Sequence, residues 1–318
     1  MKHFKYAAAI IILLFSALSV SAGNHIPARY ISKDALRLEK KASGGRMFLI
    51  TVIDSNDKDI GKRCEIDLDE ITYTFSEIAD WLFMDMEAPK VIMGDEFSKA
   101  AVDDAIDNWL QSQNPGKDDI VVFYYSGHGF RYPGDVSPYP RMWLKTTTDQ
   151  DVSRNNLRME EDIYERIRKM GAGVNLVISD CCNTTDAGDN ANYDNITAPT
   201  RKRVVHKRPE DEEELDEEAN FIERLFEPEY PLSILVTAAD KSEFAGGKAD
   251  FGGFFTFYFL EALSKCAFDG TIDADWKNIF KYADENASYR ARSAACPEAK
   301  HTPQGRCVQT VKFKIDTE

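Results

Sequence analysis

The sequence predicts an α/β protein, with a mostly parallel β-sheet flanked by helices on both faces. Short apolar runs rich in β-branched and aromatic residues alternate, from residue 46 onward, with longer segments of helical spacing. Two of the apolar runs end abruptly in reactive side chains, a histidine at one and a cysteine pair at the other. Ligands of open α/β sheets bind at the carboxyl ends of the strands, so these two strand ends mark a candidate site.

The first 22 residues are predicted to be a signal peptide. Lys2 and Lys5 give a basic start, residues 7–18 form an apolar stretch, and small residues lead to a cleavage site near Ala22. A membrane anchor is the alternative, but this apolar run is shorter than the ~20 residues that a span needs. Residues 23–45 are interpreted as an N-terminal extension. The mature protein is expected to be exported, secreted or periplasmic, without a membrane span.

The first half of the fold is predicted to contain three strands and two helices. Residues 47–53 and 91–93 are short β-branched or apolar runs, which favour strands. Residues 67–83 and 97–113 place apolar side chains at helical spacing. Residues 119–125 are almost entirely apolar and predict a buried strand that ends at the histidine.

The second half repeats this alternation around a long interruption. The expected elements are a short edge strand at 142–144, a helix at 156–170, strands at 174–179 and 233–237, helices at 252–265 and 274–293, and a closing strand at 308–313. The strand at 174–179 is the one that delivers the cysteine pair.

The interruption at 186–231 is the second distinctive region. Turn-forming residues are followed by a basic cluster and then by an acidic run at 210–218. A stretch of this length without a core pattern is usually functional or disordered, and a solvated loop is the plain alternative. The basic cluster consists of Arg201, Lys202, Arg203, Lys207 and Arg208.

Composition excludes several classes of function. The formal net charge is −15, which disfavours binding to nucleic acid or to an anionic membrane and suits basic substrates. Six cysteines are too few for a disulfide-dependent scaffold in a chain of 318 residues, although Cys296 and Cys307 are the expected pair. The spacing of the cysteines does not fit a structural zinc site.

His128 is the candidate base. The chain has five histidines, and His128 alone ends a predicted core strand. Gly127 and Gly129 permit unusual backbone angles and close approach of a ligand, although a structural histidine in a tight turn is the alternative. A thiol beside an imidazole is the minimal equipment for nucleophilic acyl transfer.

The cysteine pair leaves a choice open. Successive strand residues point to opposite faces, so Cys181 and Cys182 should diverge, and Asp180 should share the face of Cys182. On the neighbouring strand, Ser126 and His128 should share a face in the same way. The spacing does not say which cysteine faces the histidine, and both could be packed core residues.

Two motifs resemble the caspase superfamily, specifically its metacaspase and bacterial caspase-like branch. They are Ser-Gly-His-Gly at 126–129 and Asp-Cys-Cys at 180–182, and the order of strands and helices is similar from 46 to 313. The resemblance implies a caspase-haemoglobinase-like three-layer sandwich. Residues 46–185 would then be the large-subunit-like part, and residues 232–318 the small-subunit-like part, with 186–231 as the intersubunit-like loop.

The resemblance also implies roles. Cys182 would be the nucleophile and His128 the general base and acid, with the backbone N–H groups of Gly129 and Cys182 as the oxyanion hole. An acidic substrate-binding pocket would fall on Asp180, with Ser126 and Asp95 beside it and Asp240 as a weaker candidate. Carboxylates there favour Arg or Lys before the scissile bond.

The expected function is therefore that of an exported cysteine endopeptidase that forms a thioester acyl-enzyme and acts on proteins or peptides with basic residues. Self-cleavage at the basic cluster defined above, Arg201 to Arg208, is a further hypothesis. No cofactor is expected to be required and no metal site is expected. Calcium remains an alternative, which the residues after Gly129 disfavour because they lack the fuller acidic pattern of many metacaspases. The alternatives are a clostripain-, gingipain- or legumain-type peptidase with a different pocket, and a catalytically silent caspase-like interaction module.

Overall fold

A computed structural model describes residues 44–146, 148–185, 221–268, 270–293 and 306–317. These residues all belong to one compact unit that begins at Gly44. The predicted signal peptide, almost all of the N-terminal extension and the basic cluster of the interruption lie outside the described residues. Within the described residues, no helix is long and apolar enough to cross a membrane.

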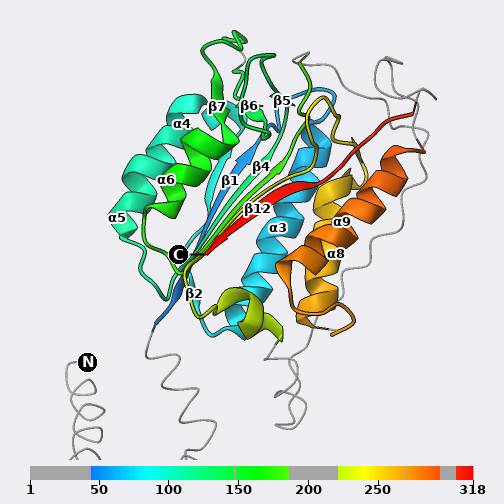
Figure 1. Cartoon of the computed structure of the whole chain (residues 1–318). Coiled ribbons are helices and arrows are strands. Elements are labelled where there is room, and N and C mark those ends of the chain that lie inside the picture. The colour runs from blue at the N-terminus through cyan, green and yellow to red at the C-terminus, as the bar shows by residue number, and fades with distance from the viewer. Residues whose placement is uncertain (1–43, 147, 186–220, 269, 294–305, 318) are drawn as a thin grey trace, which may run out of the picture. The chain divides into compact units, whose positions relative to one another are not determined.

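The centre of the unit is a seven-stranded sheet with the order β12-β9-β8-β4-β1-β2, in which β3 also pairs with β1 (Figure 1). Its pairs are parallel except for β12, which runs antiparallel to β9 at the edge. The mostly parallel sheet was predicted correctly. The strands are β1 (Arg46–Ile53), β2 (Asp85–Met86), β3 (Lys90–Met93), β4 (Ile120–Ser126), β8 (Val174–Asp180), β9 (Leu232–Thr237) and β12 (Lys312–Thr317).

Helices cover both faces of this sheet, which gives three layers (Figure 1). One face carries α4 (Lys99–Asp104), α5 (Gln111–Gln113) and α6 (Glu165–Arg168), and the other carries α3 (Gly61–Trp81), α8 (Phe254–Ala267) and α9 (Trp276–Ala291). Wider π-helical turns at Ala105–Leu110 join α4 to α5, and similar turns at Met159–Tyr164 precede α6. A short 3-10 turn, Gly94–Glu96, follows β3.

Two hydrophobic cores follow from the alternation of side chains along the strands. In β4, Phe123 and Tyr125 pack into the core under α4 and α6, whereas Val122 and Tyr124 pack into the core under α3, α8 and α9. All four side chains are fully buried. Strands that are buried on both faces read as continuous apolar runs, which is why this strand could be predicted from sequence.

Small antiparallel strands surround the carboxyl edge of the main sheet. β5 (Gly129–Phe130), β6 (Arg141–Trp143) and β7 (Asn156–Arg158) form a separate three-stranded sheet, and β10 (Gly247–Lys248) pairs with β11 (Gly252–Gly253). The strand predicted at 142–144 is therefore not an edge of the main sheet. It pairs with the chain that follows His128, through a bond from Trp143 N–H to the His128 carbonyl at 2.9 Å.

Two predicted boundaries were wrong by several residues. The helix predicted from residue 67 begins at Gly61, because Asp57 accepts hydrogen bonds from the backbone of Asp59 and Ile60 and so starts the helix earlier. The closing strand predicted from residue 308 begins at Lys312. The backbone before it is engaged elsewhere: Glu243 accepts from Thr310 N–H, and Asp284 accepts from Val311 N–H.

Two predicted helices also begin late, because their first residues form β7 and β11 instead. Gly252 has a φ of +89°, which is incompatible with a helical start at that position. Among the cysteines, Cys307 is disulfide-bonded, and the other four described cysteines are free thiols. Cys296, the predicted partner of Cys307, lies outside the described residues.

Candidate active site

The two strand ends that carry the reactive side chains are neighbours in the sheet. β4 and β8 pair in parallel with Ser126 opposite Asp180, and the Gly127 N–H donates to the Asp180 carbonyl at 3.4 Å. Beyond this pair, a Cβ atom on Gly129 would lie 2.2 Å from the carbonyl oxygen of Cys182. Only glycine permits this approach, and it holds the segment after β4 directly against the cysteine pair.

The cysteines point into different cores, as alternation along the strand predicts. Cys181 is fully buried in the core under α4 and α6, and burial raises the pKa of its thiol well above the usual value. Cys182 lies on the opposite face and is 5% exposed, and its Sγ accepts a hydrogen bond from Ala245 N–H at 3.4 Å. A donor to sulfur favours the thiolate, so Cys182 is the better nucleophile of the two.

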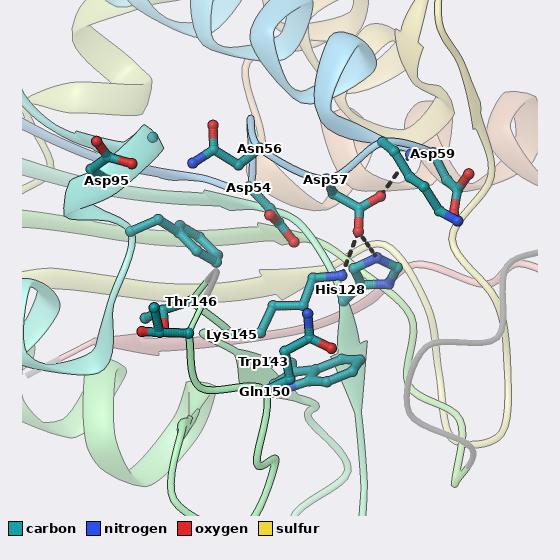
Figure 2. Close-up of a pocket in the computed structure, with 14 residues that line it drawn as sticks. Asp54, Asn56, Asp57, Asp59, Asp95, His128, Trp143, Lys145, Thr146 and Gln150 are labelled. Atoms are coloured by element: carbon teal, nitrogen blue, oxygen red, sulfur yellow. Dashed lines mark hydrogen bonds and ion pairs between the residues drawn. The ribbon is translucent and has the colours of Figure 1, made fainter.

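His128 is oriented by a carboxylate. Its Nε2 lies 3.1 Å from Oδ2 of Asp57, and the Lys145 ammonium forms an ion pair with the same carboxylate (Figure 2). A carboxylate only accepts hydrogen bonds, so the proton of this contact belongs to Nε2 when Asp57 is ionised. The neutral imidazole therefore keeps Nδ1 free to accept a proton.

The ionisation states fit that arrangement. Burial acts to raise the pKa of Asp57, but the hydrogen bonds from His128 and Lys145 outweigh it and hold that pKa well below the usual range. Burial lowers the pKa of His128, with the Asp57 hydrogen bond acting in the opposite direction. At neutral pH the pair is thus an ionised carboxylate and a neutral imidazole, which is the state that a general base requires.

The backbone around His128 is held just as firmly. Tyr125, the buried residue near the end of β4, donates its hydroxyl to the His128 carbonyl at 2.5 Å. A Cβ atom on Gly127 would lie 2.6 Å from that same hydroxyl, so the residue before the histidine must be glycine for this bond to form. The His128 ring also packs edge-to-face against Trp143, with ring centroids 5.8 Å apart.

A pair of buried carboxylates lies on the α3 and α8 side of the strand ends. Asp180, at the end of β8, accepts from Thr256 N–H at 3.0 Å and from the Thr256 hydroxyl at 2.7 Å. Asp67, on α3, accepts from the Ser126 hydroxyl at 2.9 Å and from Gly253 N–H at 2.8 Å. Both side chains are at most 4% exposed.

The two carboxylates are close enough to influence each other. Burial raises the pKa of Asp67 to about 7, and the charge of Asp180 adds to the effect. Burial also raises the pKa of Asp180. The positive charge of Arg63, on the first turn of α3, acts in the opposite direction on both. Two adjacent carboxyls that resist joint ionisation favour binding of an additional cation.

A separate pocket lies at the carboxyl ends of β1, β3 and β4. It has a volume of about 740 Å³ and contains His128, Asp57 and Lys145 at one end and Asp95 at the other (Figure 2). Asp54, which follows β1, also lines it, and burial raises the pKa of Asp54 to about 7. Among the described residues, Asp54, Asp57 and His128 could together offer ligands to a metal ion, but the Lys145 ammonium already pairs with Asp57.

The structure brings some of the predicted site residues together and separates others. Ser126 and Asp180 lie at the paired strand ends, as expected. Asp95 was expected beside Asp180, but it lines the pocket that contains His128. Ser126 and Asp180 do not line that pocket, so Asp95 is not part of the site with the buried carboxylates. Asp240 forms an ion pair with Lys312 at 3.4 Å on the loop after β9. The predicted self-cleavage residues, from Arg201 to Arg208, lie outside the described residues.

Sequence reasoning missed two residues that matter here. Asp67 belongs to the buried face of α3, one turn from Cys64 and Ile71, so a carboxylate on an apolar helical stripe was the available signal. Asp57 follows β1, and the rule that ligands bind at the carboxyl ends of strands applied to β1 as well as to β4 and β8.

The fold and the site together define a class. A thiol and a carboxylate-oriented imidazole at adjacent strand ends of a parallel sheet are groups that nucleophilic acyl transfer can use. The model of the peptidase C14 family, the caspase domain, matches residues 52–312. The chain therefore belongs to the caspase-domain family of cysteine peptidases.

Other comparisons add little to this assignment. The crystal structure of caspase-1 from Spodoptera frugiperda is similar, with 8% sequence identity and a TM-score of 0.44. That similarity covers 85% of this chain and 87% of the insect chain. No curated protein matches the sequence.

Proposed function

We propose that the protein is a cysteine endopeptidase that cleaves peptide bonds after Arg or Lys. The observation that carries this specificity is the buried pair of Asp67 and Asp180 on the face of the strand ends that also bears Cys182. A guanidinium or ammonium group of the substrate would neutralise this pair and donate hydrogen bonds to it, with a strength that neutral donors lack. An aspartate side chain in the same place would add a further carboxylate to a pair that already resists joint ionisation.

The proposed reaction uses the dyad in two steps. Neutral His128 removes the thiol proton of Cys182 through Nδ1. The resulting thiolate attacks the carbonyl carbon of the scissile bond, and the N–H groups of Gly129 and Cys182 stabilise the developing oxyanion. Protonated His128 then donates its Nδ1 proton to the leaving amine, which leaves a thioester on Cys182. Neutral His128 next removes a proton from water, whose oxygen attacks the thioester and releases the carboxylic acid.

Fluorogenic peptides test this proposal. Peptides that end in Arg, Lys or Asp before the reporter should be compared with wild type and with Cys182→Ala. Turnover of the Arg and Lys peptides by wild type alone is expected. Exclusive turnover of the Asp peptide would overturn the pocket assignment, and the absence of any turnover would favour a silent interaction module.

Self-processing within the 186–231 loop is part of the proposal. The chain leaves β8 at Asp180 and passes Cys182 a few residues before the loop begins. It returns to the core with a helical segment at 221–226 and to the sheet at Leu232 in β9. It contains five basic residues in eight positions, from Arg201 to Arg208. Incubation of wild type beside Cys182→Ala should nick only the wild type there, and equal nicking of both would refute self-processing.

Export and independence from calcium complete the proposal. Export is supported by the basic and apolar pattern of residues 1–22 alone. Turnover of the Arg peptide should be unchanged when calcium is removed with a chelator. A loss of turnover that added calcium restores would show that a calcium site is required.

A further inference from the structure

The pocket beside His128 has features that the dyad and the buried carboxylates do not use. It is acidic: Asp54, Asp57, Asp59 and Asp95 line it, against two lysines, Lys58 and Lys145. The Lys145 ammonium is paired with Asp57, which shows that the pocket accommodates an ammonium group. Two formal negative charges remain after all six charged side chains are counted.

One of these carboxylates, that of Asp54, has a buried oxygen without a hydrogen-bond partner among the described residues. Asp54 is 2% exposed, and its Oδ2 is buried without a hydrogen-bond partner in the described part of the chain. Its carboxylate points towards the middle of the pocket, between Asn56 and Lys145 (Figure 2). A buried polar atom without a partner is costly, so this oxygen is poised for a donor that enters the pocket.

Two further carboxylates are open to solvent. Asp59 and Asp95 are exposed, and neither carboxylate forms an ion pair or hydrogen bond to the residues that the structure describes. Asp95 lies at the end of the pocket away from His128 (Figure 2). A long basic side chain that entered beside His128 would therefore meet Asp54 first and Asp95 further in.

The mechanism fixes which substrate residue would enter. A general acid must lie within hydrogen-bond reach of the amine that it protonates, so the residue after the scissile bond lies on the His128 side. The residue before the scissile bond lies on the other side, where Cys182 contacts Ala245 and where Asp67 and Asp180 are buried. Neither carboxylate of that buried pair lines the pocket.

We propose that this pocket binds a Lys or Arg residue immediately after the scissile bond, so that the enzyme prefers substrates with two consecutive basic residues. The inference rests on the proposed cleavage after Arg or Lys and names the substrate class more narrowly. The chain itself contains such pairs in the 186–231 loop: Arg201-Lys202, Lys202-Arg203 and Lys207-Arg208.

A series of quenched fluorescent peptides tests the inference. All members carry Arg before the scissile bond and differ only in the next residue, which is Lys, Arg, Gln or Glu. We expect wild type to have a kcat/KM about 10-fold higher for Lys or Arg than for Gln, with Glu the poorest. This preference should shrink as salt is added, because exposed charges are screened.

Variants locate the effect in the pocket. The double variant Asp59→Asn/Asp95→Asn should lower the ratio of Lys to Gln peptides, because Asp54 is then the remaining unpaired carboxylate of the pocket, and it should improve cleavage of the Glu peptide. Asp69→Asn removes an exposed carboxylate from α3 that does not line the pocket, and it should keep the wild-type ratio.

The outcomes separate this inference from the proposed function. Equal kcat/KM for the Lys and Gln peptides in wild type would overturn the inference while cleavage after Arg stands. An unchanged preference in the double variant would also overturn it, because the preference would then arise elsewhere. If wild type cleaved no member of the series, or no more than Cys182→Ala does, both proposals would fail.

Discussion

Asp57 connects the end of β1 to His128, which follows β4. It follows β1, begins the turn into α3 through its contacts with Asp59 and Ile60, and accepts the Nε2 proton of His128. One carboxylate thereby fixes both the entry to a helix and the tautomer of the His128 imidazole. A positioning role of this kind is separable by experiment from a purely structural one.

Replacing Asp57 by Asn should lower kcat for an Arg peptide by about 10²-fold, at the lower end of the range for general acid–base catalysis. The Asp57 hydrogen bond raises the pKa of His128 and the Lys145 charge lowers it, so removal of Asp57 should move the acidic limb of kcat/KM to lower pH. Stopped assays between pH 4 and 8 measure both effects.

Asp80→Asn is the matched control, because Asp80 is an exposed residue at the end of α3. It should leave kcat and the pH profile unchanged. A wild-type pH profile in Asp57→Asn would show that the carboxylate supports the fold and not the imidazole.

The raised pKa of Asp67 predicts that cation binding depends on pH. Its pKa is raised to about 7, so the carboxyl is mostly neutral at pH 6 and mostly ionised at pH 8. Affinity for a small guanidinium inhibitor should therefore rise about 10-fold over that interval, following the ionised fraction of one group. Asp67→Asn should abolish the pH dependence, and a rise that survives in this variant would assign it to another group.

At the scale of elements, α8 depends on the glycine that precedes it. Gly253 donates its N–H to Asp67, and a Cβ atom there would lie 2.0 Å from Oδ2 of Asp180. Its backbone angles are ordinary, with a φ of −71° and a ψ of 140°, so only the contact demands glycine. The start of α8 is thus fitted closely around the two carboxylates.

Gly253→Ala should destabilise the fold by about 1–3 kcal/mol, as overpacking in a close-packed interior does. It should also weaken binding of Arg peptides, because Asp180 must move away from the added methyl group. Gly134→Ala, where a Cβ atom would meet nothing within 4 Å, is the control and should change neither property. Chemical denaturation measures the stability, and KM for Arg peptides measures the binding. Equal behaviour of the two variants would show that the close contact between Gly253 and Asp180 does not require glycine.

The elements also show where prediction from sequence was possible. β4 and β8 were found because both are uninterrupted apolar runs between turns, a signal that needs no partner strand. β5, β7, β10 and β11 were missed because strands of two or three residues have no periodicity to detect. They exist because the chain after Gly129 pairs with β6, which pairs with β7, and because the segment at Gly252 pairs separately with β10.

At the scale of the whole molecule, one sheet joins the two parts of the chain that the interruption separates. β9 pairs with β8 along six residues and with β12 on its other side, and α8 packs into the same core as α3. Residues on both sides of the interruption also build the site, since Ala245 and Thr256 contact Cys182 and Asp180. A cut within the loop should leave this assembly intact.

Insertion of a recognition site for an unrelated site-specific protease between residues 201 and 208 tests this expectation. After cleavage, the two fragments should elute together in gel filtration and separate only on denaturing gels. Uncut protein with the same insertion is the control. Separation of the fragments under native conditions would mean that the shared sheet and core do not hold them together.

The sequence by itself determined the α/β class, the strand ends at His128 and Cys182, and the family resemblance. These features are encoded in local runs of residues, which can be recognised without knowing what packs against them. It did not determine that Asp67 joins Asp180, that Asp57 orients His128, or that Asp95 belongs to a different pocket from Asp180. The residues of each pair are between 70 and 115 positions apart in the sequence. Only the order of strands in the folded sheet brings them together or keeps them apart.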